Sequence, residues 1–110
     1  MENHFKRITD KQMLADLIGR SNAGPIVIFK HSITCSASAT AYGEMARVPA
    51  EVALVEVQSA RELSREIEAL TGVEHESPQV IILRNGMAVW HASHWKIRAA
   101  VIEQAVRDAA

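Results

Sequence analysis

A run of four apolar residues, Ile26 to Phe29, constrains the fold of this chain more than any other feature. Its first three residues are β-branched, and no polar residue alternates with them. This pattern is typical of a strand that is covered on both faces. Such a strand lies in the middle of a parallel or mixed sheet, between layers of helices. The run therefore predicts an α/β protein whose helices come from the segments on either side of it.

The remaining segments support this interpretation. Helices are expected where apolar residues recur at helical spacing, and strands where short apolar runs lie between turn residues. The expected order along the chain is a helix that is capped by Thr9 and ends near Gly19, a strand over 26–29, a helix over 36–47, a strand over 52–57, a helix that ends at Gly72, strands over 80–83 and 87–90, and a last helix that carries Ile97, Val101 and Val106.

Capping and turn residues predict several element boundaries. Thr9 to Gln12 and Ser59 to Glu62 both have the form of a capping box, which begins a helix. Gly72 is placed to end the helix before it. Asn85-Gly86 is the strongest short signal for a hairpin between two strands. Ser93 could cap the last helix.

This order of elements resembles the thioredoxin fold, in which a βαβ unit is followed by a ββα unit. A chain of 110 residues can bury one core, so we expect a single domain over residues 1–110. The expected architecture is an α/β, thioredoxin-like fold with a mixed four-stranded sheet, helices on both faces and an extra N-terminal helix. Many unrelated functions share such a fold, so function has to be argued from the site.

The composition excludes several classes of function. The net charge is −1 and no basic cluster is present, which argues against binding to nucleic acid. No segment approaches the ~18 apolar residues of a membrane span. The N-terminal segment MENHFKRITD has charged residues where a signal peptide needs an apolar run. We therefore expect a cytoplasmic protein that binds neither nucleic acid nor membranes.

Cys35 is the only cysteine, so the chain cannot form an internal disulfide. It follows the first expected strand and stands at the start of a helix, at the sheet edge where ligands usually bind. A helix N-terminus favours a thiolate over a thiol, which predicts a lowered pKa and a nucleophile. The alternative is a small buried residue. The polar neighbours Ser32, Thr34, Ser36 and Ser38 argue against that alternative.

Ser38 stands where dithiol enzymes of this fold have their second cysteine. Its hydroxyl can donate a hydrogen bond toward the thiolate but cannot attack a disulfide, so an external thiol must release the intermediate. The predicted chemistry is monothiol thiol-disulfide exchange, with Thr34, Ser36 and Ser38 supporting the thiolate. His31 is either a cationic imidazole that also favours the thiolate or a solvated histidine at the end of a strand.

Three motifs together resemble the monothiol bacilliredoxin (YtxJ-like) family over almost the full chain: HSITCSAS, the Ser-Pro before the third strand, and the WHASHW segment at the last turn. The resemblance implies that Cys35 removes bacillithiol from mixed disulfides on cytoplasmic proteins. It also implies bacillithiol, or another low-molecular-weight thiol, as co-substrate and no bound cofactor. The chain departs from the family at Ser36, where proline is typical, and at Ala37, which leaves the redox potential open.

The resemblance to thioredoxin-like proteins also implies a cis-proline at Pro78, with the backbone of Ser77 facing the sulfur. We place Ser77, Pro78, His91 and His94 at the rim that contacts the substrate. His91 and His94 lack a third ligand at zinc-like spacing, so no metal site is expected. The tryptophans of the same segment, at positions 90 and 95, are expected to pack the last helix onto the sheet.

Two other functions remain open at this level. One is an iron-sulfur carrier like the monothiol glutaredoxins, which have a Cys-Gly-Phe-Ser motif where this chain has Ser36-Ala37 in the middle. The other is a redox-inert interaction module in which Cys35 only contributes to packing.

Overall fold

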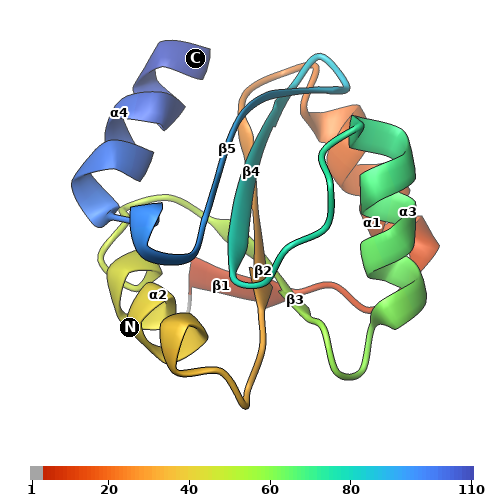
Figure 1. Cartoon of the computed structure of the whole chain (residues 1–110). Helices are drawn as coiled ribbons and strands as arrows, with labels where there is room; N and C mark the ends of the chain where they lie inside the picture. Colours follow the sequence, from red (N-terminus) through yellow and green to blue (C-terminus); the bar gives the residue numbers. More distant parts are fainter. Residues whose placement is uncertain (1–3) are drawn as a thin grey trace.

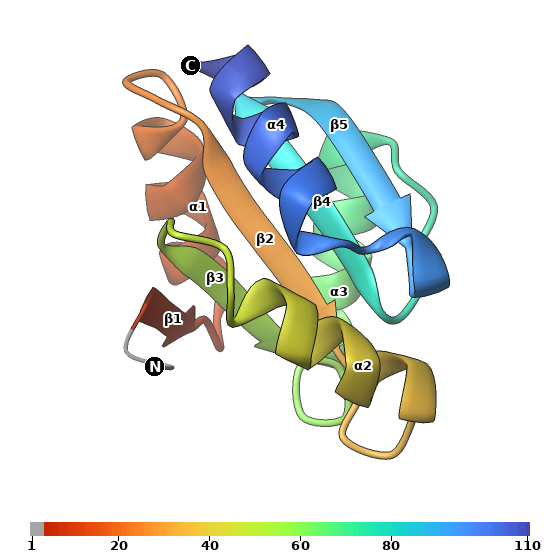
Figure 2. The same ribbon diagram turned by 90° about the vertical axis from the view of Figure 1, so that its left-hand side faces the viewer.

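The helices of the computed structural model form two pairs, one on each face of a central sheet (Figures 1 and 2). The structure describes residues 4–110, so the first three residues of the charged N-terminal segment lie outside it. Helices α1 (Lys11–Arg20) and α3 (Arg61–Thr71) cover one face. Helices α2 (Ser36–Met45) and α4 (Ala99–Ala109) cover the other. This arrangement confirms the predicted fold class.

The sheet has the strand order β1-β3-β2-β4-β5. Its strands are β1 (Phe5–Arg7), β2 (Ile26–His31), β3 (Val52–Glu56), β4 (Gln79–Arg84) and β5 (Met87–Ser93). The first three run parallel to one another, whereas β4 is antiparallel to both β2 and β5. The strand predicted to be central, β2, lies in the middle of the sheet.

Side chains of β2 alternate between two apolar cores. Val27 and Phe29 belong to the core under α2 and α4, and Ile28 belongs to the core under α1 and α3. Because both faces of β2 are covered, its sequence has no polar alternation. The first core also contains Ala41, Met45, Val80, Ile82, Ile97 and Ile102, and the second contains Leu14, Leu17, Leu63, Ile67, Ile81 and Leu83.

The sheet has five strands where four were expected. The additional strand, β1, is three residues long and pairs in parallel with β3 through Phe5 opposite Val52 and Arg7 opposite Leu54. Two of its three residues are basic and exposed, as is common for a short strand at a sheet edge. Such a strand has no apolar pattern by which the sequence could predict it.

The capping box predicted for the first helix begins one residue too early. The N-cap is Asp10, whose carboxylate accepts a hydrogen bond of 2.9 Å from the backbone N–H of Met13. Gln12 donates to Asp16 in the next turn, not back to the cap. Asp and Thr are both good N-caps, so two candidates in succession leave the first residue ambiguous.

The second predicted capping box is also wrong, whereas two predicted turns are confirmed. Ser59 donates to the carboxylate of Glu56 at 3.1 Å, and α3 starts after Ala60, which gives it no side-chain cap. Gly72 ends α3 with a positive φ of 74°, a conformation that glycine adopts without strain. Asn85 and Gly86 have φ values of 54° and 76°, as a tight hairpin turn requires.

The last helix starts later than predicted. Strand β5 continues to Ser93, a short 3-10 helix, η2 (His94–Lys96), follows, and α4 begins after Arg98. Ser93 therefore does not cap α4. Trp90 packs against the core, as expected, but Trp95 lies on η2 with 64% of its surface exposed and does not attach α4 to the sheet.

Candidate active site

Cys35 lies at the carboxyl end of β2, at the first position before α2. The chain leaves the sheet at His31, turns through Ser32 to Thr34, and enters the helix with Cys35 as its N-cap in an extended conformation (φ −107°, ψ 129°). The thiol is half-buried and free. The predicted placement of the thiol at a helix start is confirmed.

The start of α2 lowers the pKa of the Cys35 thiol. The backbone N–H of Ser38 is the largest cause, and the N–H of Ala37 and the Ser38 side chain act in the same direction, while partial burial of the sulfur opposes them. The sulfur makes no short cap hydrogen bond of the kind that Ser or Asp makes. A lowered pKa increases the fraction of thiolate, which is the form that attacks a disulfide. The direction agrees with the prediction.

Ser38 is completely buried under the first turn of α2. Its hydroxyl oxygen accepts a hydrogen bond of 3.1 Å from the backbone N–H of Ser32, which ties the helix to the loop before it. The hydroxyl proton stays available for the sulfur, and the side chain contributes to the lowered thiol pKa, as predicted. Ser38 thus both shapes the loop and supports the thiolate.

A shallow hollow of about 310 Å³ opens beside the sulfur. It is lined by His31, Ser32, Ile33, Cys35, Ala39 and Tyr42. The side chain of Ile33 is 61% exposed there, so an apolar side chain lies at the edge of the reactive thiol. We call this the cysteine hollow. Its size suits a small group joined to the sulfur.

His31 lines the cysteine hollow. Its ring packs against Phe29 and Tyr42, with centroid distances of 5.7 and 5.0 Å, and its buried Nδ1 has no hydrogen-bond partner within residues 4–110. Burial lowers the pKa of His31, opposed by the Glu56 carboxylate and by the Ser38 backbone. The ring packs against aromatic side chains and also lines the hollow, so an effect of His31 on the thiolate stays a prediction.

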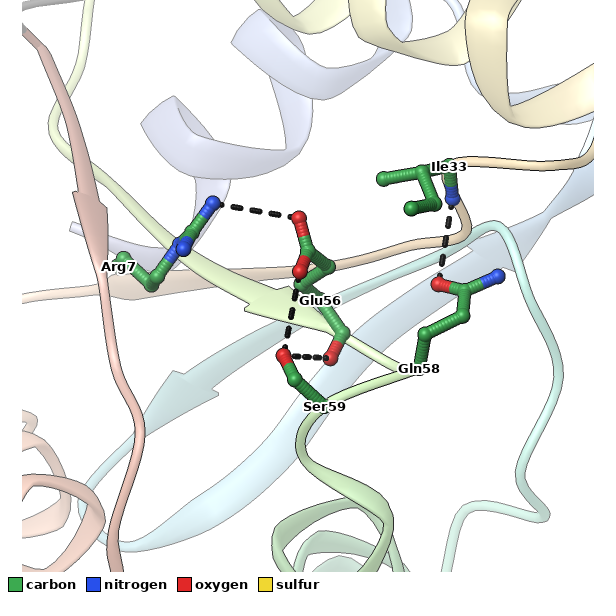
Figure 3. Close-up of polar contacts among 5 residues, drawn as sticks. All are labelled: Arg7, Ile33, Glu56, Gln58 and Ser59. Atoms are coloured by element: carbon green, nitrogen blue, oxygen red, sulfur yellow. Dashed lines mark hydrogen bonds and ion pairs between the residues drawn. The ribbon is translucent and has the colours of Figure 1, made fainter.

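Gln58 holds the loop that leads to Cys35, a role that could not be predicted from the sequence. Its side-chain N–H groups donate to the hydroxyls of Ser32 at 2.7 Å and Thr34 at 3.2 Å. Its carbonyl oxygen accepts from the backbone N–H of Ile33 at 3.2 Å (Figure 3). A glutamine after a strand has no distinctive sequence signal, since its partners lie 24 to 26 residues away.

A second set of contacts holds the segment that carries Gln58 (Figure 3). The carboxylate of Glu56 at the end of β3 pairs with Arg7 of β1 at 3.2 Å and accepts from the Ser59 hydroxyl at 3.1 Å. The edge strand that the sequence did not predict therefore supports the segment from which Gln58 reaches the active-site loop.

Replacing Gln58 by leucine is expected to loosen the loop before Cys35. Three hydrogen bonds are lost at a partly exposed site, so we expect a loss of about 1–2 kcal/mol in local stability. Amide hydrogen exchange at Ile33 should then become about tenfold faster. The matched control is Gln104→Leu on α4, where the glutamine bonds only within its own helix. Equal exchange rates at Ile33 in both variants would contradict the role of Gln58.

The Ser77-Pro78 peptide bond is cis, as predicted from the resemblance. Pro78 is buried and immediately precedes β4, in which Gln79 lies opposite Lys30 of β2. This register brings Pro78 to the carboxyl end of β2, where the loop to Cys35 starts. The carbonyl of Pro78 accepts from the backbone N–H of His94 at 3.0 Å, so η2 is attached to the same sheet edge.

The structure separates the two histidines of the predicted rim. His94 is held beside the cis-proline, and its Nδ1 lies 3.4 Å from a carboxylate oxygen of Glu76. His91 pairs with Ile81, whose side chain faces α1 and α3, so His91 lies on the face of the sheet away from α2. The buried hydroxyl of Ser77 has no hydrogen-bond partner among the residues that the structure describes. Substrate contacts by these residues stay a prediction.

A buried lysine, Lys30, lies just before the loop that leads to Cys35, and its burial was not predicted from the sequence. Lys30 of β2 has no exposed surface, and its Nζ lies 3.1 Å from Nδ1 of His75. Burial lowers the pKa of Lys30 to about 8, while the Glu68 carboxylate opposes the shift. Burial and the positive charge of Lys30 likewise lower the pKa of His75. The only sequence signal is a lysine at the end of an apolar strand, where a charged residue usually reaches solvent.

No group of three or more metal-binding side chains gathers anywhere in residues 4–110. Within the same residues, no helix is both long and apolar enough to pass through a membrane.

Comparisons with known proteins agree with this geometry. A family model described as monothiol bacilliredoxin BrxC matches residues 6–102. A solved structure that is provisionally described as an oxidoreductase with a thioredoxin fold is similar at 29% identity and a TM-score of 0.86, covering 94% of this chain and 95% of the other. The thioredoxin of Trypanosoma brucei brucei shares 16% identity at a TM-score of 0.75, with 94% and 88% covered. The thioredoxin of Fasciola hepatica shares 14% identity at 0.73, with 96% and 99% covered.

Proposed function

Because this chain belongs to the monothiol bacilliredoxin family, we propose that it removes bacillithiol, or a similar low-molecular-weight thiol, from mixed disulfides on cytoplasmic proteins. Thiol redox chemistry is common to this family and to the thioredoxin-fold oxidoreductase that this chain resembles. The small thiol, the client proteins and the cytoplasmic location are the proposed part.

The reaction has two exchange steps. In the first, the Cys35 thiolate attacks the small-thiol sulfur of the adduct, forms a mixed disulfide with it, and releases the client cysteine as a thiolate that takes up a proton. In the second, a thiolate of the free small thiol attacks that mixed disulfide. This step releases the Cys35 thiolate and a disulfide of two small-thiol molecules. The small thiol is therefore the reductant, and no cofactor takes part.

The observation that carries the proposal is that Cys35 lies at the start of α2 and is followed, three residues later, by Ser38 at the resolving position. The first turn lowers the pKa of the thiol, so the nucleophile is available. The side chain at the resolving position is a buried serine, which cannot take over the mixed disulfide. A lone reactive thiol beside a shallow hollow suits a small thiol as its exchange partner.

Transfer of the adduct to Cys35 tests the proposal directly. A model peptide that carries one bacillithiol or glutathione adduct is mixed with a slight excess of the reduced protein, in the absence of free thiol. After an acid quench, mass spectrometry should show the reduced peptide and a protein heavier by one small thiol at Cys35. An unmodified protein beside an intact adduct would contradict the proposal. A covalent complex of protein and peptide that persists would show attack on the wrong sulfur.

Replacing Ser38 by cysteine is expected to make release independent of external thiol. Side chains three residues apart at a helix start are close enough for a disulfide, so the new thiol would attack the mixed disulfide at Cys35. The protein should then release the small thiol and gain an internal disulfide, both visible by mass spectrometry without added thiol. Ser36→Cys is the matched control, because adjacent helical side chains point apart. Equal release by both variants would contradict the assigned resolving position.

A further inference from the structure

A second hollow lies on the α3 side of the same sheet edge. It has a volume of about 260 Å³ and lies between the end of β3, the first turns of α3 and the loop after α3. We call it the arginine hollow. It is lined by Val57, Gln58, Arg61, Ser64, Arg65 and His75.

The two arginines of the arginine hollow are not paired with an acid in the part of the chain that the structure describes. Arg61 and Arg65 lie one turn apart on α3, and within residues 4–110 neither makes an ion pair or a side-chain hydrogen bond, in contrast with three arginines that pair with glutamates elsewhere. Behind His75, the Nζ of Lys30 adds another positive group. Glu68 accepts a hydrogen bond from the backbone N–H of His75, and the carboxylates of Glu68 and Glu76 both act on the His75 ring.

An unpaired hydroxyl lies in the wall of the same hollow. Ser64 lines the hollow, only 4% of its surface is exposed, and its Oγ has no hydrogen-bond partner among the described residues. Buried polar atoms are nearly always paired, because an unpaired one costs stability. The N-cap of α3, Ala60, offers no side-chain acceptor to the amides of the first turn. Glu62, the acid of that turn, does not line the hollow.

Gln58 connects the arginine hollow to the reactive thiol. Gln58 lines the hollow, and its amide group holds the backbone of Ile33 and the hydroxyl of Thr34. Cys35 is the next residue. A molecule attached to the sulfur and extending over Thr34 and Gln58 would therefore arrive at Arg61 and Arg65.

We propose that the arginine hollow binds a carboxylate group of the molecule that exchanges at Cys35. Guanidinium groups bind carboxylates through paired, charge-assisted hydrogen bonds, and the Ser64 hydroxyl supplies a further donor. The carboxylate comes from the small thiol or from an acidic side chain of the client. The inference deepens the proposed function and rests on it for the identity of the molecule that is bound.

Binding of a free carboxylate is tested separately from exchange. Succinate is titrated into the reduced protein at constant ionic strength, and amide chemical shifts are followed by NMR. Shifts should be largest in residues 57–65. The dissociation constant should rise about tenfold in Arg61→Gln/Arg65→Gln, as expected for the loss of charge-assisted hydrogen bonds, and severalfold in Ser64→Ala. Arg47→Gln/Arg107→Gln has the same net charge and should bind like the wild type. Equal weakening in both double variants, or shifts elsewhere, would overturn the site.

Exchange assays identify the source of the carboxylate. Adducts of glutathione and of uncharged 2-mercaptoethanol are placed on a neutral peptide and on an acidic peptide. If the small thiol supplies the carboxylate, the Arg61→Gln/Arg65→Gln variant loses about tenfold in the ratio of kcat/KM for the glutathione adduct to that for the 2-mercaptoethanol adduct. If the client supplies the carboxylate, the variant instead loses in the ratio of kcat/KM for the acidic peptide to that for the neutral peptide.

The outcomes separate this inference from the proposed function. If the wild type exchanges all adducts and neither ratio changes in the variant, the proposed function stands and the arginine hollow is not part of it. If the wild type exchanges none of them, the proposed function fails together with the assignment to an exchanging molecule, whereas the succinate titration still decides whether the hollow binds a carboxylate.

Discussion

Replacing Cys35 by serine is expected to slow removal of a small-thiol adduct by at least about 10³-fold, to the rate of the free thiol alone. A hydroxyl at this position is not ionised at neutral pH and cannot form a mixed disulfide. The half-buried side chain makes no cap hydrogen bond, so serine should fit without loss of stability. The measurement is the rate at which a glutathionylated or bacillithiolated peptide becomes reduced in the presence of a fixed concentration of free thiol.

Two comparisons make the Cys35→Ser result specific. Thr40→Ala changes an exposed residue of the same helix, away from its start, and should keep the wild-type rate. Far-ultraviolet circular dichroism and thermal unfolding should be unchanged in both variants. Rapid adduct removal by Cys35→Ser would show that Cys35 is not the nucleophile. A wild-type rate no faster than that of the free thiol alone would favour an inert interaction module.

Replacing Lys30 by methionine is expected to stabilise the protein at pH 7 by about 1–3 kcal/mol. Lowering the pKa of Lys30 from 10.5 to about 8 corresponds to a cost of about 3 kcal/mol for holding the charged lysine in the folded state. Methionine has a similar length and no charge to bury, and such replacements are often stabilising. Loss of the hydrogen bond to His75 offsets only part of this gain, because His75 is exposed and water can replace the lost partner.

The stability difference between Lys30→Met and the wild type should change with pH in one direction. Between about pH 8 and 10.5 the unfolded chain binds a proton at Lys30 that the folded chain lacks, so the wild type gains stability as the pH rises through this range. The advantage of Lys30→Met should therefore shrink from pH 8 toward pH 10.5. Urea unfolding of both proteins at several pH values measures the difference, with the exposed Lys96→Met as control. A constant difference across this range would contradict the burial of a charged Lys30.

The architecture was predictable because it depends on apolar runs. The strand at Ile26 to Phe29, the hairpin turn at Asn85-Gly86 and the end of α3 at Gly72 each follow from a local pattern with one physical solution. The edge strand Phe5–Arg7 does not, since backbone pairing with β3 holds it in place and its side chains stay mostly in solvent. The start of α4 was also missed, because the WHASHW segment has no feature that separates a strand end from a helix start.

For the active site, the sequence could predict the residues near Cys35 in the chain but not those brought to it by folding. The effect of the helix start on the thiol and the place of Ser38 depend on neighbours within three positions. The contacts of Gln58, the burial of Lys30 beside His75 and the packing of His31 against Tyr42 depend on partners between 11 and 45 positions away. Side-chain chemistry alone cannot predict such contacts before the topology is known.

The position of Cys35 as the first residue before α2 also determines when during folding the thiol becomes reactive. A ten-residue helix is not stable alone in water, and α2 depends on packing Ala41 and Met45 against the finished sheet. The amides that favour the thiolate therefore come together only in the native protein. In a newly made or denatured chain, Cys35 has the pKa of an ordinary thiol. Reactivity is thus gained only once α2 has packed onto the sheet, so that unfolded chains do not compete with folded molecules for small-thiol adducts.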